Sequence, residues 1–219
     1  MATDDSKILV KFDDGELKHY ARETLMLSPR CLVRMLKSPS KVYLDDNHCR
    51  EYLEPVLDTL EASLSPRMDM LPSAGLSTEE LKRISNAAQD YGVLKYWQTC
   101  VRAALYATRP RLPLHRELQI GLAIEDPTII VQATWEVSSD DLFRMKSSEI
   151  ETIGLEIWNR LREVVEGLGL DSYTTAVGPK LQEWIDKGKE ANLDSGKSVL
   201  ETLFKDGSST RRHNSYSRY

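Results

Sequence analysis

Cysteine is scarce in this chain, and long apolar runs are missing. The three cysteines, Cys31, Cys49 and Cys100, lie far apart among 219 residues. Three scattered cysteines cannot supply the disulfide framework of a small secreted domain, so we expect a reducing compartment, the cytoplasm or the nucleus. No apolar segment approaches the ~20 residues of a membrane-spanning helix. Residues 1–7 are polar and acidic, unlike a secretory signal.

An excess of positive charge is also missing. The formal net charge is -5, so no overall field attracts nucleic acid or an anionic membrane. Apolar residues make up 41% of the chain and charged residues 29%, which is ordinary for a globular protein. The length suits one domain with a large core, with or without a helical extension.

Residues 7–36 carry the clearest local pattern. Ile8, Val10 and Phe12 alternate with other residues at the period of a strand. Asp13-Asp14-Gly15 follows and suits a tight hairpin turn, after which residues 16–20 can return as a second strand. The apolar period then becomes helical, which predicts a helical pair carrying Leu25, Met26, Leu32, Val33, Met35 and Leu36.

The next segments predict a short strand and three helices. Residues 41–45 alternate as a third strand. A helix follows that either starts near Tyr52 or is kinked there, because proline is easily tolerated only in a first turn, and we favour the start near Tyr52. Ser77-Thr78-Glu79-Glu80 is a capping box that opens a helix, which Gly92 ends. A further helix covers about residues 93–107.

The second half predicts helices only. Residues 109–113 contain two prolines and form a candidate boundary. Asp126-Pro127 begins a helix, Ser138-Ser139 and Ser147-Ser148 are candidate caps, and residues 149–166 form one long helix. Two more helices carry, respectively, Val177, Leu181, Trp184 and Ile185, and Val199, Leu200, Leu203 and Phe204. Residues 206–219 have almost no aliphatic content, which predicts a disordered tail.

This order of elements resembles the BTB/POZ domain, particularly the divergent BTB-like proteins common in fungi. Leu25, Leu32 and Leu36 keep the spacing of the family's first helical segment, and Ser28-Pro29 lies one residue early. Later, the family's "L..lA..Y" helix is matched by Leu81, Ala87-Ala88 and Asp90-Tyr91, followed by Leu94. The chain departs from the family at Lys18, Ala21 and Thr24, which replace an aromatic residue, a histidine and an aliphatic residue.

The resemblance implies an α+β, predominantly helical fold, in which an N-terminal β-hairpin and a short third strand pack on helical hairpins. It divides the chain into a BTB/POZ-like domain over residues 1–108, an all-α extension over 109–205 and the tail over 206–219. It also implies a non-catalytic protein–protein interaction module, with adaptor work in ubiquitin ligation or transcriptional regulation and self-association through the hairpin and first helix. Only residues 1–7 precede the first strand, which leaves a monomer open, and no cullin-binding motif is clear.

No motif assigns a catalytic, cofactor-binding or metal-ligating residue. Gly196-Lys197-Ser198 ends like a phosphate-binding loop, but position 191 is alanine where that loop needs glycine. His48-Cys49 is an adjacent pair, whereas tetrahedral zinc sites use spaced ligands. Paired carboxylates such as Asp13-Asp14 and Asp140-Asp141 fall at turns and helix starts, where capping explains them.

Two other functions stay open at this point. A small helical enzyme would assemble its site from distant residues, such as His19 or His115 with carboxylates. A helical nucleic-acid-binding protein would use basic clusters, such as Arg109, Arg111 and Arg116 or the arginines of residues 206–219. Interleaved aromatics are missing around Arg109, Arg111 and Arg116, and the default for the tail is a solvated, flexible terminus. The four tryptophans, at 97, 135, 158 and 184, favour core packing.

Overall fold

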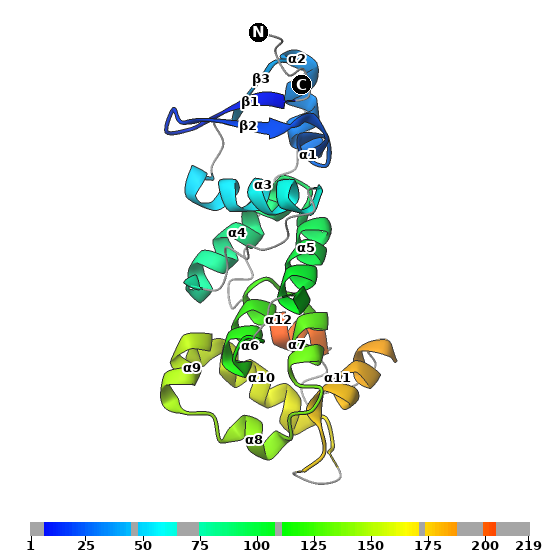
Figure 1. The fold of residues 1–219 in the computed structure, drawn as a ribbon. Coiled ribbons are helices and arrows are strands. Elements are labelled where there is room, and N and C mark those ends of the chain that lie inside the picture. Colours follow the sequence, from blue (N-terminus) through cyan, green and yellow to red (C-terminus); the bar gives the residue numbers. More distant parts are fainter. Residues whose placement is uncertain are drawn as a thin grey trace, which may run out of the picture.

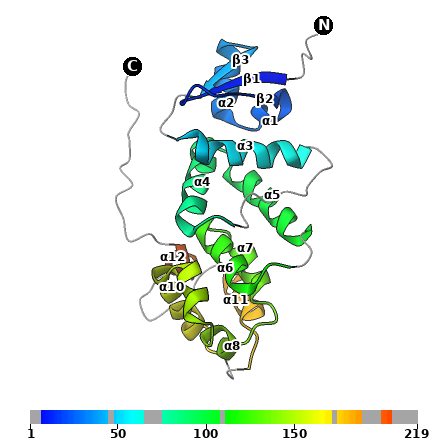
Figure 2. The same cartoon turned by 60° about the vertical axis from the view of Figure 1, so that its left-hand side comes forward.

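The computed structural model describes residues 7–44, 48–64, 75–107, 111–170, 174–187 and 199–204. The fold is mostly helical with one small mixed sheet, so the α+β, predominantly helical class is confirmed. In both views of the ribbon the sheet lies at one end with α1 and α2 (Figures 1 and 2). Helix α3 lies beneath this layer, α4 and α5 follow, and the later helices form the other end.

The sheet has three strands in the order β2-β1-β3. Strands β1 (Lys7–Phe12) and β2 (Leu17–Ala21) form the predicted antiparallel hairpin. Gly15 closes its turn with a φ of 91°, a conformation that favours glycine. Strand β3 (Lys41–Leu44) pairs in parallel with β1, with Leu9 opposite Lys41. The parallel pairing places the intervening helices α1 (Arg22–Met26) and α2 (Pro29–Lys37) against the sheet.

Helix α3 (Arg50–Leu64) starts earlier than the sequence suggested. The amides of Tyr52 and Leu53 both donate to the Cys49 carbonyl, which already closes the first turn there. Pro55 therefore lies inside the helix, and the predicted start near Tyr52 is wrong. Pro55 has no amide to donate to the carbonyl four positions earlier, that of Glu51, and Glu51 is an exposed residue near the start of the helix.

Helices α4 (Thr78–Asp90) and α5 (Leu94–Ala107) have the predicted boundaries to within one residue. Ser77 and Glu80 form the capping box. At the other end of α4, the amides of Gly92 and Val93 donate to the carbonyls of Gln89 and Ala88. This is the Schellman arrangement, and it requires the positive φ of 73° that Gly92 adopts.

The second half consists of seven helices in the described residues: α6 (Leu114–Ala123), α7 (Pro127–Ala133), α8 (Ser139–Phe143), α9 (Ser147–Ile153), α10 (Leu155–Gly167), α11 (Val177–Asp186) and α12 (Val199–Phe204). Asp126 and Ser138 cap α7 and α8 as predicted. Lys146, not Ser147 or Ser148, occupies the N-cap of α9, and its amide donates to the Glu149 carboxylate at 2.8 Å.

The single long helix expected over residues 149–166 is wrong. Gly154 adopts a φ of 97° and separates α9 from α10, because an α-helix cannot continue through that backbone conformation. The apolar stripe of the sequence continues across the break, since Ile153, Ile157 and Leu161 are all buried. Periodicity alone therefore concealed the break.

Two hydrophobic cores meet at α6 and α7. The first core is formed by residues between Ile8 and Ile129, and the second by residues between Leu118 and Leu203. In α6, Ile120 belongs to the first core and Leu118 to the second. This helix is thus shared between the two cores, and the boundary between residues 108 and 109 stays a prediction.

Helix α11 approaches α7 so closely that a side chain is excluded at Gly178. A Cβ atom there would lie 2.5 Å from the Val131 carbonyl oxygen and 2.7 Å from the backbone of Trp135. The Gly178 amide also donates to the Thr134 carbonyl at 2.9 Å. Glycine therefore permits the backbone contact that attaches α11 to the rest of the second core.

Replacing Gly178 with Ala should lower the free energy of unfolding by about 1–3 kcal/mol, the usual cost of forcing a methyl group into filled space. Equilibrium urea unfolding measures this change. Gly75→Ala is the control, because no heavy atom lies within 4 Å of the corresponding Cβ position. Equal stability of the G178A variant and the unmodified protein would show that the close approach is wrong.

Candidate interaction surface

Polar side chains join β2 to α3, and we call this group the polar seam: Lys18, Tyr20, Glu54 and Asp58. The Lys18 ammonium donates to Asp58 at 2.7 Å and to Glu54 at 2.9 Å. The Tyr20 hydroxyl donates to Asp58 at 2.8 Å. Burial alone would lower the pKa of Lys18, but its hydrogen bonds to the two carboxylates outweigh burial and raise it. Burial, and then the Asp58 charge, raises the pKa of Tyr20.

One turn further along α3, Glu61 continues this attachment to α1. Its carboxylate accepts hydrogen bonds from the Ala21 amide, at 3.1 Å, and from the buried Thr24 hydroxyl. Ala21 is the N-cap of α1 but has no side-chain group to satisfy the helix start. Glu61 therefore supplies an acceptor at the start of α1, where acidic groups are favourable.

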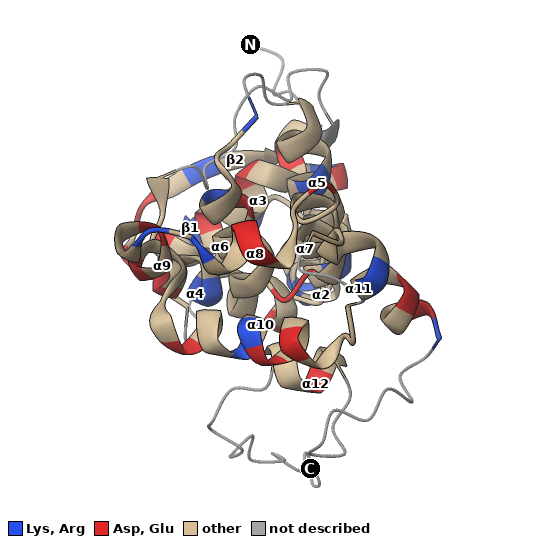
Figure 3. Cartoon of the chain, turned by 90° about the horizontal axis from the view of Figure 1, so that it is seen from below, with Lys and Arg blue, Asp and Glu red and all other residues tan. Residues whose placement is uncertain are grey.

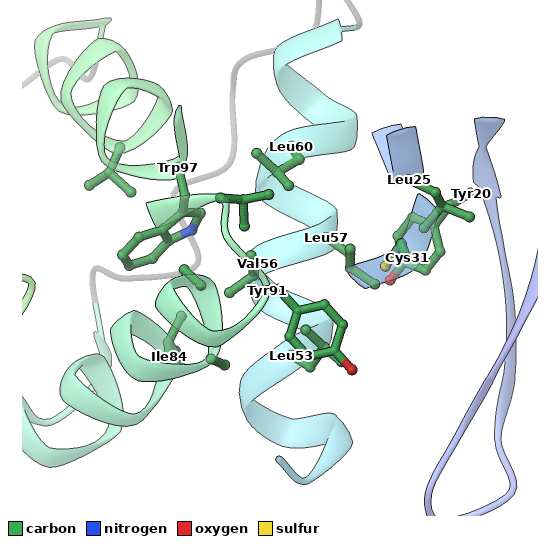
Figure 4. Packing of buried hydrophobic residues seen from close by; sticks show 14 of the residues in the cluster. Tyr20, Leu25, Cys31, Leu53, Val56, Leu57, Leu60, Ile84, Tyr91 and Trp97 are labelled. Atoms are coloured by element: carbon green, nitrogen blue, oxygen red, sulfur yellow. The ribbon is translucent and has the colours of Figure 1, made fainter. Parts of the chain in front are cut away.

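Apolar side chains of α3 pack on both sides of the helix. Figure 4 shows Leu57 pointing toward Tyr20, Leu25 and Cys31, while Trp97 lies on the opposite side of α3. All five side chains belong to the first core. Helix α3 is consequently the layer that connects the sheet and α1–α2 with α4 and α5.

Helix α2 is fixed at its first turn by α4 and its C-terminal cap. The Ser28 hydroxyl, at the N-cap of α2, donates to the Tyr91 carbonyl at 2.8 Å and is buried. A Cβ atom at Gly92 would lie 3.1 Å from Pro29. The Arg30 guanidinium lies 5.4 Å from the centre of the Tyr91 ring. These contacts fix the rotational orientation of α2 about its own axis.

That rotation leaves an apolar face exposed, which we call the α1–α2 apolar face. Cys31 and Met35 are one turn apart and point into the core. Four of the exposed residues of α1 and α2 are also apolar, beside the charged Glu23, Arg30 and Lys37: Met26 (53% exposed), Leu32 (36%), Val33 (54%) and Leu36 (77%). Exposed apolar residues gathered on one face typically mark a surface that another molecule covers. The helical spacing of these residues could be predicted from the sequence, but which of them point inward could not.

Among the described residues, the histidines and cysteines do not come together. His48 lies 2.7 Å from Asp90, and His115 lies 3.7 Å from Glu149 in a different region. His19 is exposed on β2, Cys31 is buried, Cys49 is exposed, and Cys100 packs partly against the first core. Within the described ranges, no group of three or more His, Cys, Asp or Glu side chains could hold a metal ion.

The predicted basic clusters have different positions. Arg111 donates two hydrogen bonds of 2.7 Å to the Glu117 carboxylate, so a structural contact accounts for this arginine. Arg116 donates to Gln119 at 2.7 Å. Arg109, the phosphate-loop-like residues 196–198 and the tail over 206–219 lie outside the described residues. Figure 3 shows acidic and basic segments intermingled over the helices seen in that view.

The tryptophan prediction holds only in part. Trp97 and Trp158 are buried in the first and second cores, and Trp184 packs partly against the second. Trp135, at the end of α7, is 47% exposed, so its assignment to core packing is wrong. Trp135 follows α7 at the point where Gly178 of α11 closely approaches its backbone. The pattern of side chains in the sequence could not reveal this close approach.

Comparison with known proteins adds no identity: no family model, curated protein or solved structure matches the chain. Among the described helices, none is long and apolar enough to cross a membrane.

The polar seam predicts a distinct response to alkaline pH. Because the folded state raises the pKa of Tyr20, its protonated form stabilises the fold below about pH 10, and this stabilisation is lost as the pH rises further. Above about pH 10, Tyr20 alone should lower the free energy of unfolding by about 1.4 kcal/mol per pH unit.

Urea unfolding between about pH 8 and about pH 11 compares the unmodified protein with Tyr20→Phe. The unmodified protein should lose stability more steeply, and the absorbance at 295 nm that appears only on unfolding should be larger than in Tyr20→Phe by the amount of one tyrosine. Parallel stability curves for the two proteins would contradict the burial and pairing of Tyr20.

Proposed function

We propose that this protein is a non-catalytic protein–protein interaction module whose contact surface is the α1–α2 apolar face. The observation that carries this proposal is the outward position of Val33 and Leu36, each more than half exposed, on α2, which the buried contact of Ser28 with Tyr91 holds in place. Met26, at the end of α1, is also more than half exposed. Removing such side chains from water on association is favourable, at roughly 25 cal/mol per Å² of apolar area.

The order of elements supports a BTB/POZ-like assignment of the first part of the chain. A hairpin leads into α1 and α2, a third strand returns parallel to β1, and α3, α4 and α5 follow. This is the order that the sequence resemblance implies, and the helices from α6 onward correspond to its all-α extension. The assignment is a proposal, and with it the adaptor role in ubiquitin ligation or transcriptional regulation.

A second copy of the chain is one partner that this surface suits. Self-association through the hairpin and first helix is what the resemblance implies, and α1 contributes Met26 to the apolar face. Met26 at the end of α1 and Leu36 in the last turn of α2 would then be covered in the dimer. Other proteins of the same compartment are partners that would compete for the same face.

The double variant Val33→Asp and Leu36→Asp tests this function. It should abolish association with the unmodified protein's partners, including a second copy, because two carboxylates would have to leave water in the interface. Since both positions are exposed, the free energy of unfolding should change by no more than about 0.5 kcal/mol. Light scattering measures self-association, and affinity capture from the native cell compares the bound proteins.

Lys95→Glu is the control, because Lys95 is an exposed residue of α5 outside this face. The control bait should retain the proteins that the double variant loses. Identical bound proteins and an identical mass in solution for all three baits would exclude the apolar face as the contact surface.

A further inference from the structure

The sheet has a second surface, on the side that faces away from the core. Even-numbered strand residues such as Val10, Tyr20 and Val42 point inward and are buried. The odd-numbered residues of all three strands therefore form the outer face, because strand side chains alternate. The register aligns Leu9 with His19 on one side and with Lys41 on the other.

This outer face is basic in a protein whose net charge is -5. Lys7, Lys11 and Lys41 lie on it, and no odd-numbered strand residue is aspartate or glutamate. Within the described part of the chain, none of these lysines forms an ion pair with a carboxylate. In the hairpin turn, the Asp14 carboxylate pairs with Arg50 at 2.8 Å.

Two lysines of the outer face lie near the ring of Tyr43 in β3. The Lys41 ammonium lies 5.0 Å from the centre of its ring, and the Lys11 ammonium 5.9 Å. Tyr43 itself is 49% exposed. Two ammonium groups thus lie near one aromatic ring at the border of the sheet.

Strand β3 is also an open edge. The Leu9 amide donates to the Ser40 carbonyl, and in a parallel ladder the groups that face the neighbouring strand recur at every second residue. The main-chain groups of Lys41 and Tyr43 therefore point away from β1. Arg34 of α2 donates to the Tyr43 carbonyl at 2.6 Å, which agrees with that direction. No described residue bonds the Tyr43 amide or the main-chain groups of Lys41.

We propose that the β3 edge binds an extended acidic segment of another protein as a fourth strand, with its alternate carboxylates over Lys11 and Lys41. An added strand would satisfy the free main-chain groups of β3, and its alternate side chains would face the basic outer surface. The proposal rests on the proposed function as an interaction module, but it uses a different face from the α1–α2 apolar face and can fail independently.

The geometry favours a peptide over a nucleic acid. Main-chain pairing along a strand edge is a property of polypeptides, whereas single-stranded nucleic acids stack their bases on several aromatic rings along a basic groove. Tyr43 is the only aromatic residue among the odd-numbered positions of the three strands. Charge complementarity then selects acidic side chains.

The probe is a synthetic ten-residue peptide in which glutamate alternates with valine, added to the isotope-labelled full chain. Amide resonances of Lys11, Lys41 and Tyr43 should shift on titration, while those of the α1–α2 apolar face should not. A peptide with lysine in place of glutamate should cause no shift. Two further peptides, N-methylated at odd or at even positions, test main-chain pairing: one should bind and the other should not.

Variants of the protein separate charge from main-chain pairing. Lys11→Glu with Lys41→Glu should weaken peptide binding at least about tenfold, and Lys95→Glu should leave it unchanged. Tyr43→Pro removes the outward amide without removing a donor to β1, and should abolish binding. Tyr43→Ala keeps that amide and should weaken binding less than about threefold. The N-methylated peptides give the same information if the proline variant does not fold.

Each other result overturns the proposal. Absence of shifts with the glutamate peptide excludes an acidic strand at this edge, and equal binding of both N-methylated peptides excludes main-chain pairing. Equal binding of oligothymidylate would assign the basic face to nucleic acid. A dimer disrupted by Tyr43→Pro, with no peptide binding, would assign the edge to a second copy. None of these results would alter the outcome of the Val33→Asp and Leu36→Asp experiment, which tests the proposed function itself.

Discussion

The carboxylates along α3 hold the sheet and the first two helices in one orientation. Glu54 and Asp58 accept hydrogen bonds from the Lys18 and Tyr20 side chains of β2, and Glu61 accepts one from the Ala21 amide at the start of α1. The apolar side chains of the same helix pack toward Leu25 and Cys31 on one side and toward α4 and α5 on the other. A helix with both kinds of contact leaves the overlying layer little freedom to rotate or slide.

The two exposed surfaces follow from this constraint. Because α2 is held with Cys31 and Met35 inward, its remaining apolar residues must face water. Because the inner face of the sheet is buried against the helices, its basic outer face and the β3 edge remain accessible. The second core lies at the other end of the molecule and shares α6 and α7 with the first, so it does not cover either surface.

Much of the fold could be predicted from local signals. Alternation, the Asp-Gly turn, the capping box at Ser77 and the glycine at position 92 each act within a few residues of the chain. The break at Gly154 could not be found, since the apolar period continues across it. The start of α3 was misplaced because proline's position in a helix is a preference, and the first turn is already closed at Cys49.

The candidate surface was harder to predict than the fold. The sequence shows that Leu32, Val33, Met35 and Leu36 share a helix, but only long-range contacts such as Ser28 with Tyr91 decide which of them point inward. The basic outer face required the register of three strands, including a parallel pairing that no local pattern encodes. Surfaces of this kind emerge from packing, whereas catalytic motifs are more often visible in the chain itself.

The orientation of α2 can be measured directly by thiol labelling of the folded protein. A variant carrying Cys49→Ser, Cys100→Ser and Val33→Cys has one thiol on each side of that helix. At protein concentrations where the chain is monomeric, position 33 should react as fast as in an unfolded peptide, while Cys31 should stay protected until global unfolding. Rapid labelling of Cys31, or protection of position 33 in the monomer, would contradict the seating of α2 on α3.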